Sequence, residues 1–156
     1  PFLYVVAGGG EELEALCALS SQLGLARSVR FLGPLPYGDT AHVYRAADLY
    51  VQPSIPVGDF LESFGISFLE AQAAGLPCIG SDWGGVPEAV ASGETAILVP
   101  PGDLDALTGA IERLASDAEL RKTMSDKALL RAAAMDWTAH VQKLSSIIQE
   151  KTQAPR

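Results

Sequence analysis

Positive charge is scarce in this chain, and lysine is the scarcest of the charged residues. The 156 residues include four lysines, none before Lys122, and the first half of the chain has only three arginines. A phosphate site in that half must therefore rely on backbone amides, on helix dipoles or on a segment outside this sequence.

The low positive charge also excludes several classes of partner. A net charge of -8 argues against a nucleic acid or an anionic membrane as partner, because both are negatively charged and bind positively charged surfaces. No apolar run approaches the ~20 residues that span a bilayer, and the first residues do not show the basic segment and apolar stretch expected of a signal peptide. The only two cysteines, Cys17 and Cys78, lie in apolar patterns and are predicted to be buried thiols. We therefore expect a cytoplasmic protein.

Short apolar runs alternate with segments of helical periodicity. Strands are predicted at residues 2–7, 29–33, 48–54, 78–81 and 96–100. Helices are predicted at about 13–23, 39–47, 64–74, 86–92, from 103, 117–134 and 137–150. This alternation indicates an α/β fold with a doubly wound parallel sheet, in one domain over residues 1–150, and a disordered tail at 151–156. In such sheets ligands bind at the carboxyl ends of the strands.

Two acids flank the start of the helix predicted at 64–74. Ser63 is the expected N-cap, and Gly65 allows a ligand to approach the free N–H groups of the first turn. Glu62 and Glu70 would lie ~12 Å apart if both were helical, too far to share a proton or a metal. They are spaced to bind opposite ends of one extended polyol. Taken singly, each glutamate is more often a cap or a solvated side chain.

The order of motifs along the chain resembles a known family. The segments are "VVAGGGEELEAL", "VRFLGPL", "AADLYVQPS", "ESFGISFLEAQAAGLPCIGSDWGGVPEAV" and "AILVPPGD". They resemble the retaining, nucleotide-sugar-dependent glycosyltransferases of family four, with the Glu-x7-Glu signature in the fourth segment. The resemblance implies the carboxy-terminal, donor-binding half of the GT-B arrangement, with a Rossmann-like domain.

The resemblance also implies roles for individual residues. Glu62 would contact the hydroxyls of the donor sugar and help hold positive charge that develops at the anomeric carbon. Glu70 would accept hydrogen bonds from the ribose hydroxyls. The remaining donor-binding residues implied by the resemblance, or by close backbone approach, are Ser63, Phe64, Gly65, Ile66, Gly8, Gly9, Leu35, Gly84 and Gly85.

Two parts of the family pattern lie outside this sequence. One is the amino-terminal domain that binds the acceptor; the other is a central strand whose Gly-Arg end and following Lys grip the diphosphate. We expect the chain by itself to lack turnover, and the full enzyme to be cytoplasmic or peripheral at the inner membrane face. We expect a second chain, in a homo-oligomer or strand exchange, or direct pairing of the flanking strands, to fill the gap in the sheet.

Other interpretations of the motifs stay open or are weaker. Asp103 and Asp105 match a metal-binding Asp-x-Asp, but their place after Pro-Gly favours helix capping. A phosphorylase would need a lysine near the sheet for pyridoxal phosphate, and the sequence offers none there. A sugar-nucleotide epimerase or a non-catalytic nucleotide-sugar-binding or assembly module remains an alternative. The resemblance implies no metal and no cofactor besides the nucleotide sugar itself.

Overall fold

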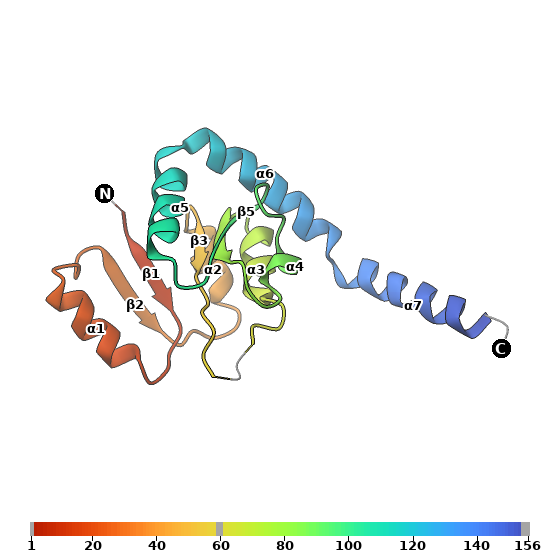
Figure 1. Ribbon diagram of the computed structural model, residues 1–156, viewed down its shortest axis with the longest axis horizontal. Coiled ribbons are helices and arrows are strands. Elements are labelled where there is room, and N and C mark those ends of the chain that lie inside the picture. The colour runs from red at the N-terminus through yellow and green to blue at the C-terminus, as the bar shows by residue number, and fades with distance from the viewer. Residues whose placement is uncertain (1, 59–60, 154–156) are drawn as a thin grey trace. The chain divides into compact units, whose positions relative to one another are not determined.

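Strands and helices alternate along the chain as the sequence predicts (Figure 1). The computed structural model describes residues 2–58 and 61–153. The strands are β1 (Tyr4–Ala7), β2 (Val29–Gly33), β3 (Tyr50–Gln52), β4 (Cys78–Ser81) and β5 (Ala96–Val99). The helices are α1 (Leu13–Gln22), α2 (Thr40–Arg45), α3 (Ile66–Ala73), α4 (Val86–Ala89), α5 (Leu104–Ser116), α6 (Ala118–Ala134) and α7 (Trp137–Gln153). The predicted α/β class is confirmed.

The chain divides into two compact units and carries two parallel sheets. Unit 1 ends at Val43 and unit 2 begins at Tyr44. Unit 1 holds β1 and β2, and unit 2 holds a three-stranded sheet in the order β3-β4-β5. Among the described residues, β1 pairs with β2 within unit 1, and β3 pairs with β4 within unit 2. How the expected gap between the flanking strands is closed stays a prediction.

Unit 1 is a strand, helix, strand unit. Tyr4 of β1 lies opposite Val29 of β2, and the register shifts after Val6. Gly8 directly follows β1, and its N–H donates to the carbonyl oxygen of Gly33 at 2.9 Å. The glycine-rich segment after β1 is thereby attached to the carboxyl end of β2.

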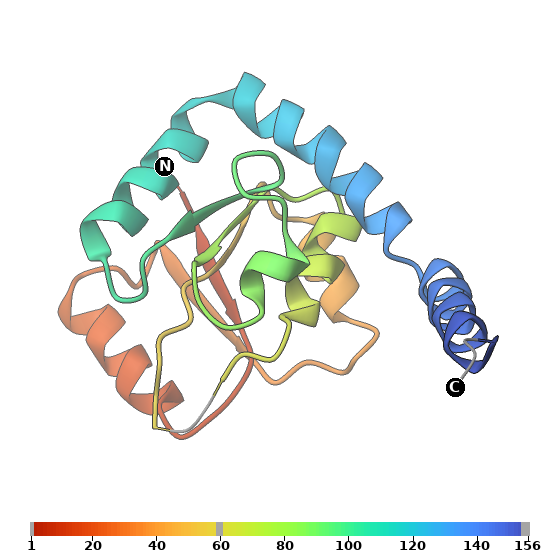
Figure 2. The same ribbon diagram turned by 45° about the vertical axis from the view of Figure 1, so that its right-hand side comes forward.

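The sheet of unit 2 is covered on both faces. Side chains alternate along each strand, so neighbouring residues pack on opposite faces. Cys78 of β4 belongs to a buried cluster that includes Phe68 of α3. Its neighbour Ile79 belongs to a second buried cluster that includes Leu114 of α5 and Met124 of α6. Figure 2 shows α6 running past α3, with which it makes contact. This is the doubly wound arrangement that the sequence predicts.

Aspartates begin two of the helices in unit 2. The carboxylate of Asp103 accepts a hydrogen bond from the N–H of Ala106 at 2.9 Å, at the start of α5. The carboxylate of Asp117 accepts one from the N–H of Leu120 at 2.8 Å, at the start of α6. The capping interpretation of Asp103 is thereby confirmed.

The carboxy-terminal helix is longer than the sequence predicts. α7 runs to Gln153, so residues 151–153 of the expected disordered tail are helical, and residues 154–156 lie outside the described part of the chain. No helix in residues 2–58 and 61–153 combines the length and the apolar composition needed to cross a bilayer. The thiols of Cys17 and Cys78 are both free; Cys78 is buried as predicted, whereas Cys17 is only partly so.

The ring of Phe68 lies so close to β4 that position 80 has no room for a side chain. Phe68 is fully buried, and its ring stands edge-on to the ring of Tyr50 with centroids 5.3 Å apart. A Cβ atom at Gly80 would lie 2.7 Å from Cζ of Phe68 and 3.1 Å from Cγ1 of Val86. The ring cannot move away without opening the core.

Gly80→Ala is therefore expected to lower the free energy of unfolding by about 1 to 3 kcal/mol. Gly109→Ala is the matched control, because Gly109 lies inside α5 and a Cβ atom there would meet nothing within 4 Å. It is expected to raise the free energy of unfolding by up to about 1 kcal/mol. Urea unfolding followed by circular dichroism measures both. A Gly80 variant as stable as the wild type would contradict the packing described here.

Candidate functional site

The chain enters α3 through a glycine with left-handed backbone geometry. Gly65 is the N-cap residue, with φ of 82°, and no side chain caps the helix. The prediction of Ser63 as N-cap is therefore wrong. A Cβ atom at Gly65 would lie 2.8 Å from Cδ2 of Phe68, so both the φ angle and the space require glycine. Glu62, Ser63 and Phe64 remain outside the helix.

The start of α3 presents backbone rather than side chains to a ligand. The ring of Phe64 packs against the core cluster around Phe68. The side chain of Ile66 is 68% exposed and carries no polar group. The first N–H groups of a helix have no partner within the helix and favour an anion. Any role of Phe64, Gly65 and Ile66 toward a ligand therefore falls to their amides.

Two glycines fix the backbone of the segment that carries Glu62. The N–H of Gly85 donates to the carbonyl oxygen of Glu62 at 2.7 Å. A Cβ atom at Gly84 would lie 2.6 Å from that same oxygen, and one at Gly85 would lie 2.1 Å from the carbonyl oxygen of Ser63. The sequence predicts close backbone approach of a ligand at these glycines. The structure shows that the backbone they approach is that of Glu62 and Ser63.

The carboxylate of Glu62 has a partner on β3. The side-chain nitrogen Nε2 of Gln52 donates to Oε2 of Glu62 at 3.2 Å. Gln52 is the last residue of β3, at the carboxyl edge of the sheet where ligands bind in this fold. Glu62 is half-buried, so this interaction is only partly screened by water.

The carboxylate of Glu70 has a different partner. The hydroxyl of Tyr44 donates to Oε2 of Glu70 at 3.3 Å. The ring of Tyr44 stands edge-on to Tyr50, with centroids 5.7 Å apart, and the hydroxyl of Tyr50 donates to Oε1 of Gln52. A continuous set of contacts therefore joins Glu70 to Glu62 within unit 2.

Burial changes the acidity of the groups beneath this site. Burial, with smaller contributions from Tyr50 and Glu70, raises the pKa of Tyr44 far above its ordinary value. Burial also raises the pKa of Tyr50 to about 12, although the hydrogen bond with Ser67 acts in the opposite direction. The pKa of the buried Cys78 thiol rises to about 12 for the same reason. All three groups are protonated, and hence uncharged, at neutral pH.

Three of the predicted donor-binding residues lie in unit 1, at the carboxyl ends of its two strands. Gly8 follows β1 with φ of 144°. A Cβ atom at Gly9 would lie 3.1 Å from Cγ of Pro34, so the glycine segment packs against the loop after β2. Leu35 lies in that same loop and is partly exposed. The structure thus groups the predicted residues in two sets, one in each unit.

Sequence reasoning missed the side chains that hold the two glutamates. Tyr44, Tyr50, Gln52 and Ser67 all take part in the contacts around them. Only Gln52 had a signal in the sequence, because it is a polar residue at the end of an otherwise apolar strand.

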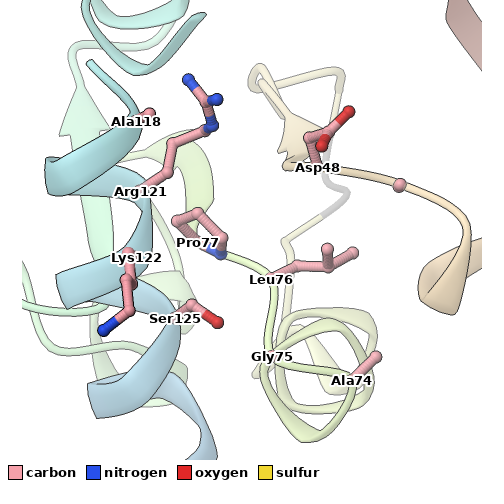
Figure 3. Close-up of a pocket in the computed structure, with 10 residues that line it drawn as sticks. Asp48, Ala74, Gly75, Leu76, Pro77, Ala118, Arg121, Lys122 and Ser125 are labelled. Carbon is pink, nitrogen blue, oxygen red and sulfur yellow. The ribbon is translucent and has the colours of Figure 1, made fainter.

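An open cavity of about 290 Å³ lies at the opposite edge of the sheet, where Asp48 and Pro77 precede β3 and β4. Figure 3 shows Arg121 and Lys122 of α6 beside it. The guanidinium of Arg121 donates to the carbonyl oxygens of Leu114 and Ala115 at 2.6 and 2.9 Å. The ammonium of Lys122 lies 3.6 Å from the carboxylate of Asp126. The cavity lies at the amino ends of β3 and β4, whereas ligands bind at the carboxyl ends of the strands in this fold, so the site around Glu62 and Glu70 is the better candidate.

The sequence model of the family described as "Glycosyl transferases group 1" matches residues 1–131, which is most of the chain. The chain belongs to this family. The predicted resemblance is thereby confirmed at the level of the family.

Several relatives carry the name D-inositol 3-phosphate glycosyltransferase. The relative from Corynebacterium jeikeium is 40% identical over 91% of this chain, and the one from Corynebacterium diphtheriae is 38% identical over 90%. The chain spans only 33% and 32% of those two proteins. It is therefore about a third of the length of these group 1 glycosyltransferases.

Solved glycosyltransferases share the fold. Sucrose-phosphate synthase from Thermosynechococcus elongatus is 30% identical, with a TM-score of 0.81 over 97% of this chain and 39% of that one. HepE of Anabaena, solved in complex with UDP-glucose, is 25% identical, with a TM-score of 0.80 over 95% of this chain and 41% of that one. The predicted Rossmann-like fold of a GT-B glycosyltransferase is thereby confirmed.

The raised pKa of Tyr50 predicts how stability depends on pH. The folded chain keeps the hydroxyl proton up to about pH 12, whereas the unfolded chain releases it at the ordinary tyrosine value near 10. The free energy of unfolding is therefore expected to fall as the pH rises through this window. Tyr50→Phe is expected to reduce that fall without abolishing it, because Tyr44 and Cys78 titrate in the same direction. Urea unfolding at pH 8 and pH 11 measures the slope, and equal slopes in the two proteins would count against a buried Tyr50 hydroxyl.

Proposed function

We propose that this chain is the donor-binding part of a retaining glycosyltransferase, which transfers a sugar from a nucleoside diphosphate sugar to an acceptor hydroxyl. The observation that supports it most directly is the fixed geometry of Glu62 and Glu70. One carboxylate precedes the start of α3 and the other follows it, and each has its own hydrogen-bond partner. Such an arrangement suits one ligand with hydroxyl groups at both ends and phosphates between them.

The two carboxylates take different ends of the donor in this proposal. Glu70 accepts hydrogen bonds from the ribose hydroxyls. Glu62 contacts the hydroxyls of the transferred sugar and stabilises positive charge at the anomeric carbon in the transition state. Both residues are half-buried, which strengthens their hydrogen bonds relative to those of a fully solvated acid.

Backbone groups take the remaining parts of the donor. The amides of Phe64, Gly65 and Ile66 approach the sugar and the diphosphate at the start of α3. Gly8, Gly9 and Leu35 of unit 1 are proposed to contact the nucleotide, with the backbone of Leu35 flanking the base. These roles rest on the resemblance to the family. They also rest on the position of the first three residues at the start of α3 and of the other three after the carboxyl ends of β1 and β2.

The chemistry follows from the retaining class. The bond between the anomeric carbon and the diphosphate oxygen breaks, and that oxygen takes the proton of the acceptor hydroxyl. The bond between the anomeric carbon and the acceptor oxygen forms on the face from which the diphosphate departs. The complex of HepE with UDP-glucose supports a uridine diphosphate sugar as one candidate donor. The names of the relatives support transfer to a hydroxyl of a small acceptor.

The acceptor site and the cations that grip the diphosphate are proposed to lie in a further part of the protein. The chain covers only 33% of a relative that carries a full glycosyltransferase name. We accordingly expect donor binding without turnover from this chain by itself. Its cytoplasmic location stays a prediction.

We also propose that a second chain pairs with β1 or with β3 at the edge of its sheet. β1 and β3 each have a single strand partner among the described residues. Sedimentation equilibrium is expected to show self-association that grows with concentration in the micromolar range. A monomer at every concentration would contradict this proposal and leave the donor site unaffected.

Donor binding is tested by calorimetric titration with UDP-glucose, UDP-N-acetylglucosamine, GDP-mannose and ADP-glucose. At least one of these is expected to bind. Glu70→Ala is expected to lower the affinity for the tightest-binding nucleotide sugar by about tenfold or more. Hydrogen bonds to a charged group contribute about 1.5 to 3 kcal/mol.

Glu112→Ala is the matched control, because Glu112 is an exposed glutamate inside a helix away from the site. The affinity of the Glu112→Ala variant for the same nucleotide sugar is expected to equal that of the wild type. The proposed function would be refuted if no member of the panel bound. The ribose role alone would be refuted if the Glu70 variant bound as well as the wild type.

A further inference from the structure

Gln52 makes four side-chain hydrogen bonds at the carboxyl edge of the sheet. Its oxygen Oε1 accepts from the hydroxyl of Tyr50 and from that of Ser67, the latter at 2.7 Å. Its nitrogen Nε2 donates to Oγ of Ser54 at 3.3 Å and to Oε2 of Glu62 at 3.2 Å. Every hydrogen-bonding position of the amide is therefore used.

These partners allow the amide one orientation. An ionised carboxylate only accepts hydrogen bonds, so the nitrogen of Gln52 must face Glu62. The hydroxyls of Tyr50 and Ser67 then hold the oxygen on the other side. Tyr50 is itself fixed by its ring contacts with Tyr44 and Phe68. The core of unit 2 thus determines where an N–H group points at Glu62.

Glu62 depends on this hydrogen bond because its segment has no regular secondary structure. Its backbone is held by the hydrogen bond from Gly85 to its carbonyl oxygen. That bond fixes the position of the residue but leaves the side-chain torsions free. The amide of Gln52 restricts those torsions, and it leaves the second carboxylate oxygen, Oε1, for another partner.

We propose that Gln52 is a positioning residue, which orients the carboxylate of Glu62 toward the sugar of the donor. This inference rests on the proposed function, because it assigns Glu62 to the sugar end. Glu70 is held by Tyr44 instead, so Gln52 acts on one end of the donor only. Loss of Gln52 therefore affects recognition of the sugar and leaves recognition of the nucleoside diphosphate intact.

Two substitutions separate positioning from a general structural role. Gln52→Glu keeps an acceptor for Tyr50 and Ser67, but it removes the donor to Glu62 and places a like charge against it. Gln52→Met removes both the donor and the acceptor and adds no charge. Both variants are compared with the wild type for binding of UDP and of UDP-glucose, and for the GDP and ADP pairs in the same way.

The quantity measured is the affinity for the nucleotide sugar relative to that for the matching nucleoside diphosphate. Both variants are expected to lower this ratio by about fivefold or more at pH 8, with nucleoside diphosphate affinity within about twofold of the wild type.

Tyr44→Phe is the matched control, since it removes the hydroxyl that holds Glu70. This variant is expected to lower the affinity for the nucleoside diphosphate and for the nucleotide sugar to the same extent. The inference is overturned if the Gln52 variants keep the wild-type ratio, or if they lose nucleoside diphosphate affinity to the same extent as sugar nucleotide affinity. If the wild-type chain binds no nucleotide sugar of the panel, the proposed function fails and this inference fails with it.

Discussion

The packing of the Phe68 ring fixes the geometry on which the candidate site depends. The ring fills the space that side chains at Gly65 and Gly80 would occupy, so it sets how the start of α3 meets β4. It also stands edge-on to Tyr50, whose hydroxyl donates to Gln52. From there a single further hydrogen bond reaches Glu62. The apolar core therefore determines the position of a charged group at the edge of the sheet.

The two glutamates are held from different directions, and this gives the Glu-x7-Glu spacing a physical meaning. Glu70 lies inside α3 and is held by Tyr44, whereas Glu62 lies before the helix and is held by Gln52 and Gly85. Two carboxylates fixed separately are suited to two points along one ligand.

Elements with a local signal could be predicted from the sequence. The bounds of β2 and β4 follow from apolar runs bounded by polar and turn residues, and the start of α5 follows from Asp103. The N-cap of α3 could not be predicted in this way. Ser63 fits the usual preference, but the ring of Phe68 and the positive φ angle at Gly65 move the cap two residues along the chain. The contacts of the glutamates with Tyr44 and Gln52 could not be predicted either, since both pairs form only through tertiary packing.

Glu62 and Glu70 are proposed to bind one nucleoside diphosphate sugar beside the start of α3. A crystal structure of the protein with a bound nucleotide sugar would decide this. Glu70 is expected within hydrogen-bond distance of the ribose hydroxyls, Glu62 within hydrogen-bond distance of a sugar hydroxyl, and the phosphate oxygens against the amides of Gly65 and Ile66. A ligand bound in the cavity beside Arg121 and Lys122, at the opposite edge of the sheet, would contradict it.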